Sequence, residues 1–216
     1  MIREGLRVLA KSAFQHFGFD VVPREVNASA LIEQVSNERD LLLTPVEAEQ
    51  LFRLVRSLAK ISGDMAEVGV YSGASSKIIR EADSQKPLHL FDTFAGLPLP
   101  SVKDQRFQAG MYSCSLPDVQ DYLACYSGIE FYEGTFPFTA DPVKHLIFSF
   151  VHLDVDLYQS TLDALRFFWP RMVEYGAILS HDYGTSKGVV SAFDEFFSGV
   201  PQAVIHLSGA QCLVVR

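Results

Sequence analysis

The sequence predicts an α/β fold built on a doubly wound, mostly parallel sheet with helices on both faces. Short apolar segments alternate with helical patterns along most of the chain, as is typical of such sheets. Residues 146–153 form a continuous, largely apolar run, the pattern of a central parallel strand buried on both faces. Two final apolar segments, 204–207 and 212–215, flank Ser208-Gly209 and predict an antiparallel hairpin.

Length and composition indicate one globular domain over residues 1–216. Hydrophobic residues make up 48%, enough for a substantial core, and the net charge of −8 argues against nucleic-acid binding. The three cysteines lie far apart, which favours reduced thiols in a cytoplasmic protein. We expect neither a signal peptide nor a transmembrane segment, because no apolar run approaches the roughly 18 residues of a membrane span.

The N-terminal segment, residues 1–24, has apolar residues at helical spacing and a mildly basic face. A helix packed on its own domain or on a partner subunit is the favoured interpretation, with a membrane-surface or substrate-cap helix as the alternative. We therefore expect residues 1–43 to form a helical cap or oligomerisation segment, and residues 44–216 the catalytic core. Residues 26–43 have no firm assignment.

The core begins with a helix that Thr44 can cap and Pro45 can open. A buried strand is expected at 65–70, a helix at 75–82, and a second strand at 88–91 that ends at Asp92.

A segment rich in Pro, Gly and Ser follows at 93–117, and 95–117 is long enough for an active-site lid. Asp118 is expected to cap a helix that runs to residue 126. The remaining elements are strands at 129–132, 146–153 and 177–180, and helices at 160–168 and 188–197.

The most informative motif is the glycine turn at residues 67–76, where a strand passes through Gly69-x-x-x-Gly73 into a helix. Such turns bring backbone N–H groups close to a ligand. The turn lacks the G-x-G-x-x-G spacing of a dinucleotide site and the lysine of a phosphate loop. Glu67 suits a cationic ligand, and S-adenosylmethionine carries an ammonium and a sulfonium group. The alternative is a turn with no ligand.

Asp92, about 20 residues beyond the turn, can accept both ribose hydroxyls of a nucleoside. This position suits adenosylmethionine and NAD alike, and the alternative is a solvated or helix-capping aspartate. Four aromatic residues surround Gly134 and Thr135, where they either border an adenine ring or pack in the core: Phe131, Tyr132, Phe136 and Phe138.

Acidic residues follow two other expected strands, at Asp154, Asp156 and Asp182. Since ligands bind at the carboxyl ends of such strands, Asp154 and Asp182 are expected to share a Mg²⁺ ion. Asp156 is expected instead to cap the following helix. His181 is a candidate general base or metal ligand, with a structural role as the alternative. His152, inside the apolar run, is expected to be a core residue.

Five motifs occur together in a familiar order: EVGVYSGASS, LFDTFAGLP, YEGTFPFT, HLDVDLYQSTLDAL and GAILSHDYG. Over residues 63–215 the chain resembles the macrocin, mycinamicin and novobiocin type of O-methyltransferases, a family of class I adenosylmethionine-dependent enzymes. The resemblance implies a Rossmann-like, seven-stranded sheet whose last strand is antiparallel.

The resemblance also implies roles for particular residues. It implies a Mg²⁺ site at Asp154 and Asp182, with His181 as a further candidate ligand, and makes Asp154 a candidate base beside His181. The implied S-adenosylmethionine site comprises Glu67, Gly69, Tyr71, Ser72, Gly73, Ser75, Asp92, Thr93, Gly134 and Thr135.

Two features depart from the family pattern. Family members often read Asp-Asp-Tyr where this chain has His181-Asp182-Tyr183, so a carboxylate is replaced by imidazole. The chain is also short before the first strand, where relatives build part of the acceptor site and the dimer contacts.

These observations predict an S-adenosylmethionine-dependent, Mg²⁺-dependent O-methyltransferase acting on a hydroxyl of a sugar or glycosylated metabolite. The expected partners are a small-molecule acceptor and further copies of the chain in a homodimer or higher homo-oligomer. One alternative is a nicotinamide-dependent oxidoreductase, for which the G-x-G-x-x-G turn is missing. Another is a methyltransferase-like binding protein without catalysis.

Overall fold

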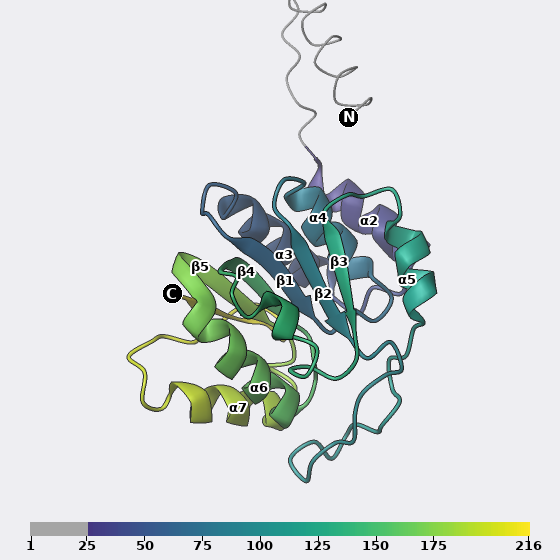
Figure 1. Cartoon of the computed structure of the whole chain (residues 1–216). Coiled ribbons are helices and arrows are strands. Elements are labelled where there is room, and N and C mark those ends of the chain that lie inside the picture. Colours follow the sequence, from purple (N-terminus) through teal and green to yellow (C-terminus); the bar gives the residue numbers. More distant parts are fainter. Residues whose placement is uncertain (1–25) are drawn as a thin grey trace, which may run out of the picture.

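The computed structural model describes residues 26–216, so the expected basic helix at 1–24 lies outside the described part. The described chain forms one seven-stranded sheet in the order β3-β2-β1-β4-β5-β7-β6 (Figure 1). Strand β7 is antiparallel to both of its neighbours, and the pairs among β1 to β5 are parallel. The strands are β1 (Asp64–Val68), β2 (Leu88–Asp92), β3 (Ile129–Glu133), β4 (Phe148–Leu153), β5 (Met172–Ser180), β6 (Ile205–His206) and β7 (Cys212–Val215).

Helices cover both faces of this sheet. One hydrophobic cluster joins the sheet to α2 (Ala28–Glu38), α3 (Pro45–Ser57), α4 (Ala74–Ala82) and α5 (Leu116–Leu123). A second cluster joins the opposite face to α6 (Tyr158–Phe168) and α7 (Lys187–Phe197), which lie together in Figure 1. Two short 3₁₀ turns, η1 (Asp141–Val143) and η2 (Trp169–Arg171), complete the described elements. The expected doubly wound fold with a closing hairpin is confirmed.

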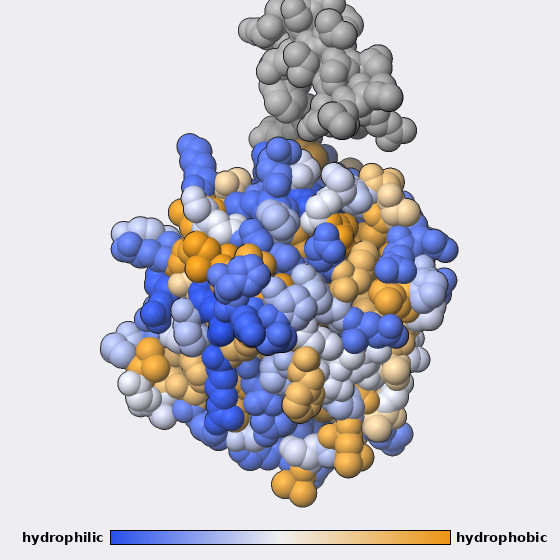
Figure 2. Space-filling model, in the orientation of Figure 1, coloured by the Kyte–Doolittle hydropathy of each residue, from blue (hydrophilic) through white to orange (hydrophobic). Residues whose placement is uncertain are grey.

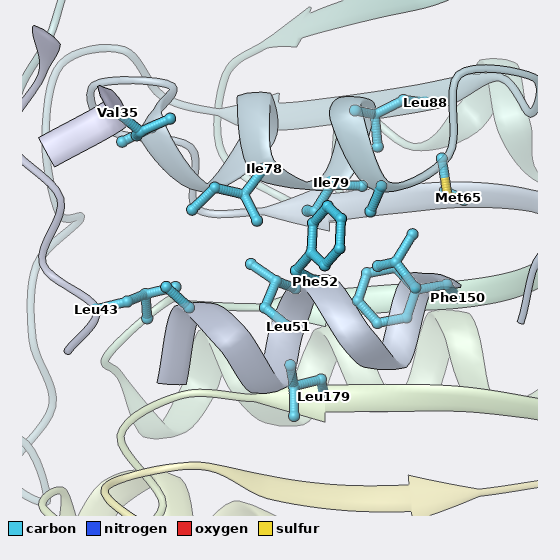
Figure 3. Close-up of a cluster of buried hydrophobic side chains, with 14 of the residues drawn as sticks. Val35, Leu43, Leu51, Phe52, Met65, Ile78, Ile79, Leu88, Phe150 and Leu179 are labelled. Atoms are coloured by element: carbon cyan, nitrogen blue, oxygen red, sulfur yellow. The ribbon is translucent and has the colours of Figure 1, made fainter. Parts of the chain in front are cut away.

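The first cluster is a layer of aliphatic and aromatic side chains between α3, α4 and the central strands. Figure 3 shows Leu51 and Phe52 of α3 beside Ile78 and Ile79 of α4, with Phe150 of β4 reaching the same layer. Full burial of one such side chain contributes about 1.5–3 kcal/mol to folding. Every residue of β4 is buried, as expected for the central strand.

The start of α3 confirms the expected cap and adds a reciprocal contact. The hydroxyl of Thr44 accepts a hydrogen bond from the Glu47 N–H, while the Glu47 carboxylate accepts one from the Thr44 N–H at 2.8 Å. This capping box satisfies two donors that a helix N-terminus otherwise leaves unpaired.

Two expected helix caps are wrong. Helix α5 begins at Leu116 and is capped by Ser115, so Asp118 lies in its first turn and Pro117 inside the helix. Helix α6 begins at Tyr158, and Asp156 makes no cap to it. Proline is compatible with a helix's first turn, which is why the loop ends earlier than its composition suggests.

The cap of α6 comes instead from the long loop. The Asp104 carboxylate accepts a hydrogen bond from the Tyr158 N–H at 2.8 Å, and its other oxygen accepts one from the Ser101 N–H at 3.0 Å. Asp104 is buried, and a Cβ at Gly188 would lie 2.1 Å from its carboxylate. The loop is therefore docked against α6 and α7 through a buried charge.

Three further differences concern element lengths. The unassigned segment 26–43 contains α2, which Asn27 caps. Strand β5 is longer than expected, because it begins at Met172 and passes through Gly176. The first hairpin strand is shorter, at two residues.

The surface of the described chain mixes hydrophilic and hydrophobic residues (Figure 2). Leu99 and Val102, in the long loop, are each 87% exposed. Figure 2 shows hydrophobic side chains at the lower edge, where Figure 1 draws this loop. Within residues 26–216, no helix has the length and apolar character needed to cross a membrane.

Replacing Asp104 by alanine tests whether the loop caps α6. We expect Asp104→Ala to lower the free energy of unfolding by about 1–2 kcal/mol, because the Tyr158 N–H loses its acceptor. Asp118→Ala is the matched control, since Asp118 accepts no cap hydrogen bond, and its effect should stay within about 0.5 kcal/mol. Urea unfolding monitored by circular dichroism measures both; equal losses for the two variants would contradict the assignment.

Candidate active site

A cavity of about 310 Å³ opens at the carboxyl ends of β1, β2, β4 and β5, a volume within the range of small-molecule sites. Its walls come from the glycine turn after β1, the long loop after β2, and the segments that follow β3, β4 and β5. Most of the expected site residues line it: Gly69, Tyr71, Ser72, Ser75, Asp92, Thr93, Gly134, Thr135, Asp154, His181 and Asp182.

The glycine turn packs directly against the end of β4. Gly69 has a φ of +89°, and a Cβ at this position would lie 1.8 Å from the carbonyl oxygen of Asp154. The Asp154 N–H donates to the carbonyl of Val68 at 2.9 Å. Glycine is therefore required both for the left-handed backbone and for the close approach. The expected cofactor turn and the expected metal-binding aspartate are thus held in contact.

The Asp92 carboxylate fixes the shape of the turn from the end of β2. One oxygen accepts hydrogen bonds from the N–H groups of Val70 at 2.7 Å and Tyr71 at 3.0 Å. The other accepts from the Phe94 N–H at 2.7 Å. The Thr93 hydroxyl lies 3.4 Å from that second oxygen and also donates to the Gly96 carbonyl at 2.6 Å. A ligand hydroxyl would compete with Thr93 for the last of the four lone-pair positions of the carboxylate.

Glu67 and Gly73 do not line the cavity. Glu67 is fully buried beneath the turn, where its carboxylate contacts His152 Nδ1 at 2.9 Å and accepts a hydrogen bond from the Ser76 hydroxyl. Gly73 begins α4 with a φ of +80° and faces the Val119 side chain. This geometry argues against the expected direct contact between Glu67 and the cofactor, because both Glu67 oxygens already have buried partners.

The aromatic residues after β3 divide between cavity and core. Phe136 lines the cavity next to Gly134 and Thr135, and its ring stacks on that of Phe168 with centroids 5.4 Å apart. Tyr132 stacks on Phe91, and Phe138 is exposed. Of the four expected residues, Phe136 is the one placed to border a ring beside Gly134.

The acidic residues after β4 and β5 meet as expected, because these parallel strands pair with Leu153 opposite Ser180. The Nδ1 atom of His181 lies 3.1 Å from an Asp154 oxygen and 3.4 Å from an Asp182 oxygen. One donor atom from each of the three residues lies within 4.8 Å of the others.

The side chains of this cluster shift one another's pKa values. Burial alone would lower the pKa of His181, but the carboxylates of Asp154 and Asp182 outweigh it and raise the pKa to about 11. Burial likewise opposes ionisation of Asp182, yet its contacts with His181 lower the pKa to about 2. Burial and the charges of both aspartates raise the pKa of Asp156 to about 9. The imidazolium offsets one of the two carboxylate charges, and protonation of Asp156 avoids adding a third.

A further carboxylate faces the other nitrogen of the His181 ring. Glu47 on α3 is 2% exposed, and its oxygen lies 3.6 Å from His181 Nε2. The same oxygen accepts a hydrogen bond from the Ala210 N–H at 2.6 Å. Burial raises the pKa of Glu47, but the hydrogen bonds from Ala210 and Thr44 outweigh it and lower the pKa.

Sequence reasoning missed two walls of the cavity. Arg106 and Tyr112 of the long loop line it, and the Arg106 guanidinium donates to the Thr185 carbonyl at 3.0 Å and lies 3.7 Å from Asp182. Residues 40–43 form another wall, where the Tyr71 hydroxyl donates to Asp40 at 3.1 Å. The sequence held one signal for Arg106 and Tyr112, which is their position within the expected lid. It held none for residues 40–43.

Backbone strain gathers around the cavity. The described residues include six non-glycine residues with positive φ, and four of them line the cavity: Tyr71, Tyr112, Asp156 and Asp182. Such conformations cost of order 1–3 kcal/mol each and cluster at functional sites.

The donor set of Asp154, Asp182 and His181 fits a divalent cation. Two neighbouring donors at about 2.1 Å from one ion lie about 3 Å apart, close to the observed separations from His181 Nδ1. The carboxylates of Asp154 and Asp182 raise the pKa of His181, so their combined negative charge favours a cation at this position.

The sheet order and the cavity at the strand ends define a class I methyltransferase fold. Two solved methyltransferases support this class. The O-methyltransferase NovP superposes with a TM-score of 0.68 at 21% identity over 78% of each chain. The calicheamicin methyltransferase CalS11 superposes with a TM-score of 0.68 at 15% identity over 90% of this chain and 94% of its own.

The chain belongs to the macrocin O-methyltransferase (TylF) family, whose sequence model matches residues 48–207. A curated relative is the 8-demethyl-8-(2,3-dimethoxy-α-L-rhamnosyl)-tetracenomycin-C 4′-O-methyltransferase of Streptomyces olivaceus, which is 27% identical over 140 residues. The match covers 57% of this chain, and the chain spans about half the length of that relative.

Replacing Gly69 by alanine tests the contact between the turn and Asp154. Gly69→Ala is expected to destabilise the protein by several kcal/mol, because strain at positive φ adds to a backbone collision. Gly110→Ala separates the two causes: its φ is +84°, but an added Cβ would meet nothing within 4 Å, so only about 1–3 kcal/mol of strain applies.

Gly199→Ala provides the unstrained control, since its Cβ also meets nothing within 4 Å. Thermal unfolding of the three variants should rank Gly69→Ala as the least stable. A Gly69→Ala protein as stable as Gly199→Ala would show that the close approach is absent in solution.

Proposed function

We propose that this protein transfers the methyl group of S-adenosylmethionine to a hydroxyl group of a sugar on a small molecule. The observation that carries the proposal is the contact between the glycine turn and the Asp154–His181–Asp182 cluster. Family membership supports methyl transfer to oxygen, because the family and the curated relative are O-methyltransferases by name.

The cofactor is proposed to lie along the cavity from the glycine turn to the segment after β3. The turn residues Tyr71, Ser72 and Ser75 would face its methionine part, and Asp92 its ribose. Gly134 and Thr135, next to Phe136, would border its adenine. Glu67 and Gly73 would act indirectly, by shaping the turn from below. A related O-methyltransferase from Bacillus cereus, with a TM-score of 0.61, was solved in complex with SAH.

The reaction is an in-line displacement at the methyl carbon. A bond forms between the acceptor oxygen and the methyl carbon as the carbon–sulfur bond breaks, and the electron pair stays on sulfur. Asp154 is proposed to take the hydroxyl proton, with His181 as the neighbouring group that the carboxylates hold in place. Most of the acceleration would come from holding both reactants in this geometry.

Asp154, Asp182 and His181 are proposed to hold a divalent cation, with Mg²⁺ as the ion expected from the sequence. When bound, such a cation lowers the pKa of an acceptor hydroxyl and orients it. Arg106 and Tyr112 would then exclude water from this end of the cavity, since the docked loop covers it.

A sugar acceptor is proposed from the relatives. The curated relative is named for a rhamnosyl tetracenomycin, and CalS11 is named a TDP-rhamnose 3′-O-methyltransferase. In this chain, Leu41, Leu42, Leu97 and Pro98 give the cavity an apolar wall that suits the non-sugar part of an acceptor.

Calorimetric titration with S-adenosylhomocysteine (SAH) and, separately, with NAD tests the proposed cofactor class. We expect binding of SAH and no heat with NAD. Binding of NAD alone would favour the oxidoreductase alternative. Methyl transfer to p-nitrophenyl α-L-rhamnoside, followed by mass spectrometry, then distinguishes an enzyme from a binding protein.

Asp154→Asn tests the proposed base. We expect kcat to fall by about 10²–10⁴-fold, because the amide accepts no proton, while SAH affinity is unchanged. Asp121→Asn on α5 is the control, since it removes an exposed charge outside the cavity. A kcat equal to that of Asp121→Asn would rule out Asp154 as the base.

A further inference from the structure

We infer that the cation site at Asp154, His181 and Asp182 selects divalent transition metals over Mg²⁺, because an imidazole oriented by Glu47 is one of its three protein donors. The inference rests on the proposed function, which places a cation there, and it adds the chemical class of that cation. Glu47 enters as a positioning residue that acts through His181.

The His181 ring is placed as a ligand on its Nδ1 side. Nδ1 lies between oxygens of Asp154 and Asp182, at 3.1 and 3.4 Å. The backbone supports this placement, because the His181 N–H donates to the Leu153 carbonyl at 2.8 Å and ties the residue to the end of β4. One donor atom from each of Asp154, His181 and Asp182 lies within 4.8 Å of the others, so a single cation can reach all three.

The Nε2 side of the ring faces the Glu47 carboxylate, which several hydrogen bonds hold in place. Thr44 and Ala210 hold the Glu47 carboxylate by hydrogen bonds of 2.7–2.8 Å and 2.6 Å. Gly209 leaves room for it, since a Cβ there would lie 2.4 Å from the Glu47 oxygen. The Glu47 oxygen lies 3.6 Å from Nε2, beyond hydrogen-bond distance, so it acts through its negative charge. That charge favours the ring tautomer with its proton on Nε2, which leaves the Nδ1 lone pair for a cation.

Donor chemistry then sets the preference. Mg²⁺ favours oxygen ligands, whereas later transition-series ions such as Co²⁺, Ni²⁺ and Zn²⁺ accept imidazole nitrogen readily. Two carboxylates and one imidazole are therefore a mixed oxygen–nitrogen set. An aspartate at position 181 would make the set all oxygen and shift it toward Mg²⁺.

The test is a comparison of Co²⁺ and Mg²⁺ affinities in the metal-free full chain and in His181→Asp, by calorimetric titration. The two carboxylates also contribute to the affinity for both ions, so the variant supplies the reference for the effect of the imidazole. We expect the ratio of the two affinities to fall at least about tenfold in His181→Asp, through weaker Co²⁺ and tighter Mg²⁺ binding. The visible absorption of bound Co²⁺ should shift as nitrogen ligation is lost.

Glu47→Gln gives a second measurement that does not alter the donor set. We expect Co²⁺ affinity to fall about 10–100-fold, because the ring loses its orienting charge, with a smaller effect on Mg²⁺. Glu49→Gln is the matched control on the same helix, since Glu49 pairs with Arg53 on the surface. A purely structural role for Glu47 would lower the melting temperature without changing the Co²⁺/Mg²⁺ ratio.

The possible failures are distinguishable. An unchanged ratio in both His181→Asp and Glu47→Gln would overturn the inference and leave the proposed methyl transfer intact. No binding of either cation by the unmodified chain would overturn the inference together with the proposed cation site. Methyl transfer in the presence of EDTA would then show whether the rest of the proposed function survives.

Discussion

The close approach of Gly69 to the carbonyl of Asp154 is the constraint on which the rest of the site depends. It joins the turn after β1 to the end of β4, so the position of one fixes the position of the other. Asp92 holds the same turn from the side of β2 through the N–H groups of Val70 and Tyr71. The cavity is therefore shaped by backbone contacts between neighbouring strands, with little dependence on flexible side chains.

Three buried carboxylates each connect parts of the fold that are distant in the sequence. Glu67 supports the turn from beneath through His152 and Ser76, while Asp104 secures the long loop to the start of α6. Glu47 joins the start of α3 to Ala210 and faces His181. Each of these charges is inside the protein because it satisfies donors that would otherwise be unpaired. Buried acidic residues with structural roles therefore support three different parts of the site.

Sequence reasoning predicted the part of the site that depends on strand ends. Asp92, Asp154 and Asp182 could be found because parallel strands bring their carboxyl ends to one edge. Contacts between residues distant in the sequence could not be found this way: Glu47 accepts from the Ala210 N–H across 163 positions, and Asp104 from the Tyr158 N–H across 54. Local patterns placed caps at Asp118 and Asp156 because they cannot show which distant acid reaches a helix end.

The hairpin that ends in β7 has a consequence for the order in which the site is assembled. Synthesis proceeds from the N-terminus, so Glu47, Asp154 and His181 all leave the ribosome before Ala210 does. Strand β7 lies between β5 and β6 and can pair with neither until it has been made. Until then the Glu47 carboxylate lacks the N–H that holds it beside His181. The glycine turn after β1 is synthesised early, but the environment of His181 is completed last.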